Sequence, residues 1–162
     1  MAAEGTPIDA GEVIVTTGGQ QVIDLVTKTL IDPGDVIVAE GPTYPGAVPT
    51  FSSYQAEVVQ IDMDADGMRV DLLEEALERL AREGRRPKFI YTVPSFQNPA
   101  GVTMSLRRAR HGQHLCAALG RGRLLFAPGR RLPRQRPVEG HLLGYHLTDP
   151  AYALADPVLV RP

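Results

Sequence analysis

The sequence predicts an α/β fold built on a mainly parallel sheet with flanking helices. Short runs rich in β-branched residues alternate with segments whose apolar residues recur at helical spacing, and this alternation continues to about residue 100. Short polar turns at residues 32–35 and 64–67 separate these segments. Strands that alternate with helices through short connections are typical of parallel sheets.

Four short runs predict strands. They occupy residues 12–16, 36–39, 57–61 and 88–93. The run at 36–39 contains only apolar residues, as expected for a strand that is buried on both faces.

Three segments predict helices. They occupy residues 20–31, 46–54 and 72–83. In the first, Val22, Ile23, Val26 and Leu30 form one apolar face. In the second, Pro49 is compatible only with the first turn or a kink. The third has a leucine and alanine stripe, and Asp71 precedes it as the expected N-cap.

The pattern weakens beyond Gly101, so the sequence specifies the C-terminal segment poorly. Residues 104–119 are compatible with a helix that Gly112 interrupts, and residues 124–127 with a strand. Residues 128–162 are rich in Pro, Gly and Arg and show little periodicity.

Overall composition indicates a globular protein. The chain has 162 residues, a net charge of −2 and 43% hydrophobic residues, which is enough to form a core. One cysteine excludes an internal disulfide. No apolar run approaches the roughly 20 residues of a membrane span. The first residues lack the features of a signal peptide, so we expect a cytoplasmic protein with no membrane partner.

The charge is distributed unevenly along the chain. Residues 1–106 hold 7 basic and 16 acidic residues, whereas residues 107–162 hold 10 arginines, no lysine and 3 acidic residues. We therefore treat residues 1–106 and 107–162 as two compositional units.

Two of the predicted loops carry residues suited to a ligand. The loop at residues 16–20 contains Gly18, Gly19 and Gln20, and backbone N–H groups at the start of a helix bind phosphate. The alternative is a tight strand-to-helix turn. The loop at residues 41–45 holds Tyr44 between two prolines, where a tyrosine either stacks on a flat heterocycle or closes the edge of the core.

A third loop, at residues 94–101, contains Asn98 followed by Pro99. The Asn98 amide is able to donate to a ligand oxygen, and the alternative is an Asx turn.

Taken together and in this order, the loops resemble the large domain of the fold-type I pyridoxal 5′-phosphate (PLP) enzymes, the class I/II aminotransferases. The resemblance is greatest to the aminoadipate/kynurenine type and to regulators that fuse a winged helix to such a domain. The matching stretches are EVIVTTGGQQ (residues 12–21), LIDPGDVIVAEGPTYPG (30–46), residues 65–80, and VPSFQNPAGVTMSL (93–106). The resemblance implies that residues 1–106 are part of a PLP-enzyme large domain.

The resemblance assigns roles to five residues. Gly18, Gly19 and Gln20 would hold the PLP phosphate, Tyr44 would stack on the pyridine ring, and Asn98 would hydrogen-bond the 3-oxygen of the ring. In this family Ser often stands at the position of Gly19, and Thr is commoner than Ala at position 100. We expect no metal site, because the chain has only four histidines and one cysteine.

The implied activity is amino-group transfer from an amino acid to a 2-oxo acid by a homodimer. That chemistry requires a lysine that anchors the cofactor and moves a proton. The two lysines of this chain, Lys28 and Lys88, lie outside the Ser-x-Ser-Lys-like context of the family. The acidic, tyrosine and arginine partners and the N-terminal segment of the family are also missing. We therefore assign no catalytic residue and expect a truncated, inactive fragment.

Alternative functions remain open at this point. One is a PLP-binding effector domain of a transcription regulator, which binds ligand without turnover. Another is a basic nucleic-acid-binding fragment, although the arginine-rich segment has few aromatic residues and no known motif. His111, His114 and Cys116 lack a fourth ligand for a metal site. A disordered or solvated basic tail accounts for residues 107–162 more simply than either binding function.

The composition of residues 107–162 predicts a frameshifted reading of a GC-rich gene. When the common codons of residues 129–135 (GRRLPRQ) are read one base forward, they permit Asp-Asp-Ala-Tyr-Arg-Asp. This resembles the family segment that supplies the acidic partner of the pyridine nitrogen and the tyrosine for the 3-oxygen. We expect the nucleotide sequence to encode this segment, and later a Ser-x-Ser-Lys-like segment, in the shifted frame. A shifted frame that soon stops, or that encodes neither segment, would contradict the prediction.

Overall fold

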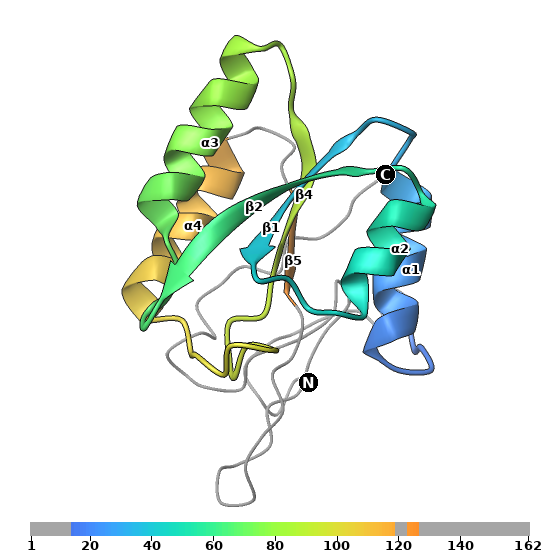
Figure 1. Ribbon diagram of the computed structural model, residues 1–162, viewed down its shortest axis with the longest axis horizontal. Helices are drawn as coiled ribbons and strands as arrows, with labels where there is room; N and C mark the ends of the chain where they lie inside the picture. The colour runs from blue at the N-terminus through green and yellow to red at the C-terminus, as the bar shows by residue number, and fades with distance from the viewer. Residues whose placement is uncertain (1–13, 119–122, 127–162) are drawn as a thin grey trace, which may run out of the picture.

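The computed structural model describes residues 14–118 and 123–126, which form three layers (Figure 1). A central sheet has α1 and α2 on one face and α3 and α4 on the other (Figure 1). The strands are β1 (Val36–Gly41), β2 (Glu57–Asp64), β3 (Gly67–Met68), β4 (Pro87–Thr92) and β5 (Arg123–Phe126). The helices are α1 (Gly19–Leu30), α2 (Ala47–Ser53), α3 (Val70–Arg82) and α4 (Leu106–Ala118).

The sheet is mainly parallel, which confirms the predicted fold class. Within the described residues the strand order is β3-β2-β1-β4-β5. Strand β1 pairs in parallel with β2 and with β4, and β4 pairs in parallel with β5. Only β3 is antiparallel, because it follows β2 through a tight hairpin turn. The carboxyl ends of β1 and β4 therefore lie at the same edge of the sheet.

Two apolar clusters pack on opposite faces of the sheet, since successive side chains of a strand alternate between faces. Ile37 and Ala39 of β1 belong to the cluster under α1 and α2, and Val36 and Val38 belong to the cluster under α3 and α4. At the centre of the first cluster Phe51 of α2 makes edge-to-face contacts with the rings of two β4 residues, at centroid distances of 5.9 and 5.5 Å. This two-sided burial explains the wholly apolar sequence at residues 36–39.

Most predicted elements are present with small shifts at their ends. Helix α2 has Pro49 in its first turn, as expected. Strand β5 and helix α4 form at the two segments where the sequence signal was weak. None of the helices within the described ranges has the length and apolar character to cross a bilayer. Residues 128–162, for which we expected little regular structure, lie outside the described residues.

The predicted strand at residues 12–16 is wrong over the part that the structure describes. Residues 14–16 do not form a strand, and Ile14 and Val15 are 60% and 92% exposed. The five described strands pair with one another, and none of them pairs with this segment. A β-branched run without a neighbouring strand gains neither ladder hydrogen bonds nor burial. Residues 12 and 13 lie outside the described part.

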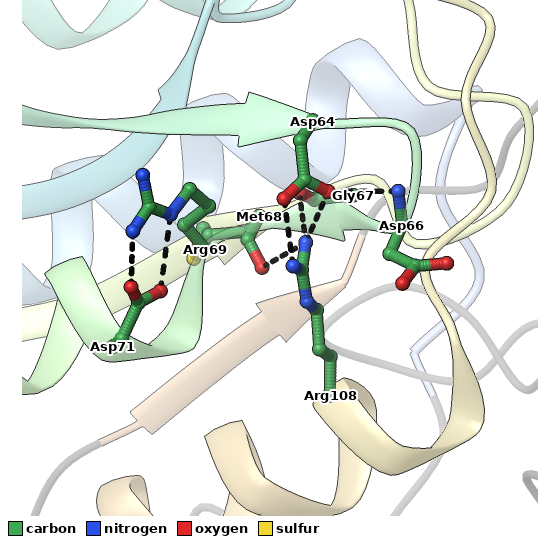
Figure 2. Close-up of polar contacts among 7 residues, drawn as sticks. All are labelled: Asp64, Asp66, Gly67, Met68, Arg69, Asp71 and Arg108. Carbon is green, nitrogen blue, oxygen red and sulfur yellow. Dashed lines mark hydrogen bonds and ion pairs between the residues drawn. The ribbon is translucent and has the colours of Figure 1, made fainter.

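The predicted N-cap of α3 is also wrong. The helix begins at Val70 with Arg69 as its N-cap, and Asp71 lies within the first turn. The side chain of Val70 is buried and adds one residue to the apolar stripe of the helix. The helix therefore begins at Val70, before the predicted start at residue 72. Asp71 instead accepts hydrogen bonds from the Arg69 guanidinium (Figure 2). Its negative charge still suits the N-terminal end of the helix dipole.

Arg108 attaches helix α4 to the β2–β3 hairpin (Figure 2). Its guanidinium donates to the two Asp64 carboxylate oxygens at 2.5 and 2.7 Å and to the Gly67 carbonyl at 2.9 Å. A longer contact of 3.5 Å reaches the Met68 carbonyl. The hydrogen bond from Arg108 lowers the pKa of Asp64 to about 2. Only 12% of the Arg108 side chain is exposed, whereas 44% of the Asp64 side chain is exposed, so the ion pair is only partly shielded from water.

We expect Arg108→Met to lower the free energy of unfolding by about 1–3 kcal/mol, because the partly buried carbonyls at the hairpin lose their donor. The matched control is Arg69→Met, which removes an exposed ion pair and should lower stability much less than Arg108→Met does. Urea unfolding followed by circular dichroism measures both. Equal losses in the two variants would contradict the assignment.

The same pair predicts a pH dependence. The folded-state pKa of Asp64 is depressed, so the stability that its carboxylate contributes is present above the unfolded value of about 3.9 and is lost as pH falls towards about 2. The difference between the parent chain and Arg108→Met should therefore be smaller at about pH 3 than at about pH 7. An unchanged difference would show that the Asp64 charge is not involved.

Candidate functional site

The first predicted loop forms the N-terminus of α1. Gly18 is the N-cap residue, with φ of 106°, a conformation that favours glycine. No side chain caps this end of the helix. The first backbone N–H groups of a helix have no partner within the helix, so this end presents donors to a ligand. Gly18, Gly19 and Gln20 thus lie at a helix end with free N–H donors, and phosphate binding there stays a prediction.

Gln20 connects the first loop to the second. Its side-chain amide donates to the Gly46 carbonyl and to the Thr50 hydroxyl, both at 2.9 Å. Gly46 also lies against the ring of Tyr44. A Cβ atom built on Gly46 would be 2.6 Å from the Gln20 side-chain oxygen and 2.6–2.7 Å from the Tyr44 ring. Two predicted cofactor residues therefore meet at one glycine.

Tyr44 lies at the boundary between the core and the surface. Its half-buried side chain packs against the apolar cluster under α1 and α2, so it does close the edge of the core. The remaining part of the side chain is exposed to solvent.

A buried carboxylate, Glu40, joins the second loop to the third. It lies near the carboxyl end of β1 and is 1% exposed. It accepts hydrogen bonds from the Thr92 hydroxyl, from the Val93 N–H at 3.0 Å and from the Gln97 side-chain amide at 3.3 Å. Burial raises the pKa of Glu40, and these three hydrogen bonds oppose that shift because they favour the charged form.

The side chain of Gln97 forms hydrogen bonds with both the loop of Tyr44 and the loop of Asn98. Its side-chain nitrogen donates to the Pro42 carbonyl at 2.8 Å, and its side-chain oxygen accepts from the Ala100 N–H at 2.8 Å. Its backbone N–H donates to the Val102 carbonyl, also at 2.8 Å. These bonds hold the turn that contains Asn98. The Asn98 side chain is exposed and makes no hydrogen bond within the described residues, so its amide is available to a ligand.

The structure thus brings the three predicted loops to one edge of the sheet. Direct contacts join Gln20 to the loop of Tyr44, and an indirect path through Gln97 joins that loop to Asn98. Sequence reasoning missed Glu40 and Gln97. The available signal was a single acidic residue directly after an apolar, fully buried strand, where a charge requires hydrogen-bond partners.

Both lysines of the chain lie away from this edge. Lys28 is exposed in the last turn of α1, about 14 Å along the helix from its N-terminus. Lys88 lies at the start of β4, where it pairs with Asp35 at 2.9 Å, just before the start of β1. Among the described residues, no group of His, Cys, Asp or Glu has an arrangement able to hold a metal ion. The side chains of His114 and Cys116 lie outside the described part.

The family model described as aminotransferase class I and II matches residues 2–111. The chain belongs to this family. It is 50% identical over 104 residues to aromatic-amino-acid aminotransferase 1 of Thermococcus litoralis, a match that covers 64% of this chain and 25% of that protein. It is 39% identical over 101 residues to 2-aminoadipate transaminase of Thermus thermophilus, covering 62% and 24% of the two chains. The chain therefore spans about a quarter of the length of these curated relatives.

Solved aminotransferase structures share the fold. Kynurenine aminotransferase of Pyrococcus horikoshii superposes with a TM-score of 0.67 at 39% identity, over 72% of this chain and 28% of that one. The α-aminoadipate aminotransferase of Thermus thermophilus also gives 0.67 at 32% identity, over 82% and 34%. The predicted resemblance to the aminoadipate/kynurenine type is confirmed, and so is the fold of a partial PLP-enzyme domain.

Because Gln20 and Tyr44 lie close to Gly46, adding a methyl group at this position should change the stability of the chain. Gly46 has helical φ and ψ of −74° and −24°, which alanine adopts without strain, so the space around it decides the outcome. We expect Gly46→Ala to destabilise the chain by about 1–3 kcal/mol and to displace the Tyr44 ring. Thermal unfolding and the near-ultraviolet circular dichroism of tyrosine measure the two effects.

The control is Gly112→Ala in the interior of α4. The nearest atom outside the helix backbone would be 4.0 Å from the added carbon, so this variant should gain about 0.5–1 kcal/mol from helix propensity. If both variants gain stability, the crowded contact at Gly46 is not as described.

Proposed function

We propose that this chain forms the cofactor-binding part of a PLP-dependent aminotransferase, with Gly18, Gly19, Gln20, Tyr44 and Asn98 as the cofactor-binding residues. The observation that carries the proposal is the joining of three loops at one sheet edge by the side chains of Gln20 and Gln97. Ligands of parallel α/β sheets bind outside the carboxyl ends of the strands. Membership of the aminotransferase family supports the identity of the ligand.

The groups present at this edge fit PLP. An uncapped helix end with glycine at its N-cap suits the phosphate. The partly exposed ring of Tyr44 suits the face of a pyridine, and the exposed amide of Asn98 suits an oxygen on its rim. The bound cofactor supplies an electron sink for the bonds at the substrate Cα. The role of these residues is to bind and orient it.

We further propose that the complete enzyme takes an amino acid as donor and a 2-oxo acid as acceptor. The names of the relatives specify aromatic amino acids, 2-aminoadipate and kynurenine, which supports an amino-acid substrate without selecting one. The homodimer implied by the family resemblance and the cytoplasmic location expected from the sequence stay predictions.

The chain alone should not turn over substrate. Transfer requires a lysine that holds the cofactor covalently and moves a proton at the substrate Cα. Lys28 and Lys88 lie away from the loops of Tyr44 and Asn98, and Lys88 is paired with Asp35. We infer that PLP binds to this chain weakly and without a specific covalent bond.

Titration with PLP, followed by borohydride reduction and peptide mapping, tests this proposal. We expect saturable binding that Tyr44→Ala weakens by about two- to tenfold, through loss of stacking on the ring. Asn98→Ala should weaken binding as well. Tyr54→Ala is the matched control, because Tyr54 packs against the same apolar cluster but lies at the far end of α2 and bonds to Asp24.

Two outcomes would overturn the proposal of weak, non-covalent binding without turnover. One is a single stoichiometric adduct at Lys28 or Lys88 that an amino acid removes. The other is formation of pyridoxamine phosphate from PLP and an amino acid, above the protein-free rate and abolished by Asn98→Ala. Absence of saturable binding would overturn the assignment of the site itself.

A further inference from the structure

We infer that Glu40 is a positioning residue that sets the loop of Tyr44 and the loop of Asn98 relative to each other, so that the two act together on one cofactor ring. This inference rests on the proposed function and deepens it. Glu40 was not among the residues predicted to bind the cofactor.

The first step of the argument is the cost of burying Glu40. A carboxylate that is 1% exposed loses nearly all of its hydration, and within the described residues it forms no ion pair. A buried charge without hydrogen bonds would destabilise the fold strongly. Glu40 must therefore be held by donors, and the donors that it uses fix the segments to which they belong.

The second step is where those donors lie. The Thr92 hydroxyl and the Val93 N–H stand at the end of β4, and the Gln97 amide stands in the following loop. One carboxylate thus collects three donors from the segment that leads to Asn98. Hydrogen bonds to a charged group are stronger than those between neutral groups. The position of that segment is tied to the end of β1.

The third step is the set of hydrogen bonds that link Glu40 and Gln97 to the loop of Tyr44. The Gln97 amide that contacts Glu40 also donates to the Pro42 carbonyl, and the Thr43 hydroxyl donates to the Glu40 carbonyl. Glu40 therefore restrains residues 42–46 through its own backbone and residues 93–100 through its side chain. Gln97 completes the link, because its oxygen accepts from Ala100 on the far side of Asn98.

The functional consequence is coupling between two contacts on one ring. Stacking by Tyr44 fixes the plane of the pyridine, and a bond from Asn98 fixes its rotation within that plane. Both are realised at once only if the two loops keep a fixed separation. The described residues contain no direct hydrogen bond between Tyr44 and Asn98, and the side-chain hydrogen bonds that link their two loops involve Glu40 and Gln97.

The test compares Glu40→Met, Glu40→Gln and Gln97→Met with the unaltered chain. Methionine matches the length of both side chains and removes the hydrogen bonds. Glu40→Gln retains an oxygen for Val93 and Gln97, and the Thr92 hydroxyl is able to reverse its role and accept, so this variant should keep most of the restraint. Glu57→Gln is the control carboxylate, because Glu57 pairs with Arg85 at the start of β2, at the opposite edge of the sheet.

The first measurement needs no cofactor. Amide hydrogen exchange should rise at residues 42–47 and 97–102 together in Glu40→Met and in Gln97→Met, and much less in Glu40→Gln. Glu57→Gln should leave both loops unchanged. If exchange rises in only one loop, or evenly over the whole sheet, Glu40 does not set the two loops relative to each other.

The second measurement uses PLP. Glu40→Met and Gln97→Met should raise the dissociation constant by about tenfold or more and return the absorption band of bound PLP to that of the free cofactor. Affinity for inorganic phosphate, which probes the α1 end alone, should not change. A bound spectrum that stays unaltered in the methionine variants would overturn the inference, because a merely structural role lowers stability without changing the environment of the ring.

The two proposals fail in different ways. If the unaltered chain does not bind PLP, the proposed function is overturned, whereas joint loosening of the two loops would still support the link through Glu40. If the unaltered chain binds PLP normally and the methionine variants do the same, the inference alone is overturned. Gln97→Met keeps the test decisive if Glu40→Met does not fold, since Glu40 retains two of its three donors in that variant.

Discussion

The parallel pairing of β1 and β4 is the constraint on which the rest of the structure depends. These strands are buried on both faces, so their central residues are mostly apolar and each face needs covering helices. Parallel strands also require crossover connections, which α2 and α3 supply on opposite faces of the sheet. Because both strands end at one edge, the loops that follow them must meet there, whatever residues those loops contain.

Elements with strong local signals could be predicted from the sequence. Helices α1 and α3 have clear apolar faces, and β1 and β4 have continuous apolar runs, so their positions are right to within a few residues. The errors arose where contacts with the rest of the fold, rather than local sequence, determine the secondary structure. Residues 14–16 have strand propensity but no neighbouring strand among those described, and the start of α3 follows the burial of Val70 rather than the capping preference of Asp71.

The residues of the candidate site also fall into those that the sequence predicts and those that it does not. Gly18, Tyr44 and Asn98 stand in loops with distinctive composition, so a pattern in the sequence was sufficient to select them. Glu40 and Gln97 act through contacts with residues more than 50 positions away in the chain, namely Thr92, Val93 and Pro42. Such contacts have no local signature. They follow only from the register between β1 and β4, which the sequence of either strand alone does not fix.

Composition and packing change at different places along the chain. Arg108 belongs to the arginine-rich segment, yet its guanidinium holds the β2–β3 hairpin through Asp64 and the Gly67 carbonyl (Figure 2). Ala109 is buried in the cluster under α3 and α4, and β5 continues the parallel sheet beyond β4. A strand added beside β4 needs only backbone hydrogen bonds and apolar side chains, and the run Leu124, Leu125 and Phe126 meets both conditions. The inversion of charge after residue 106 is therefore not, by itself, a boundary of the folded layers.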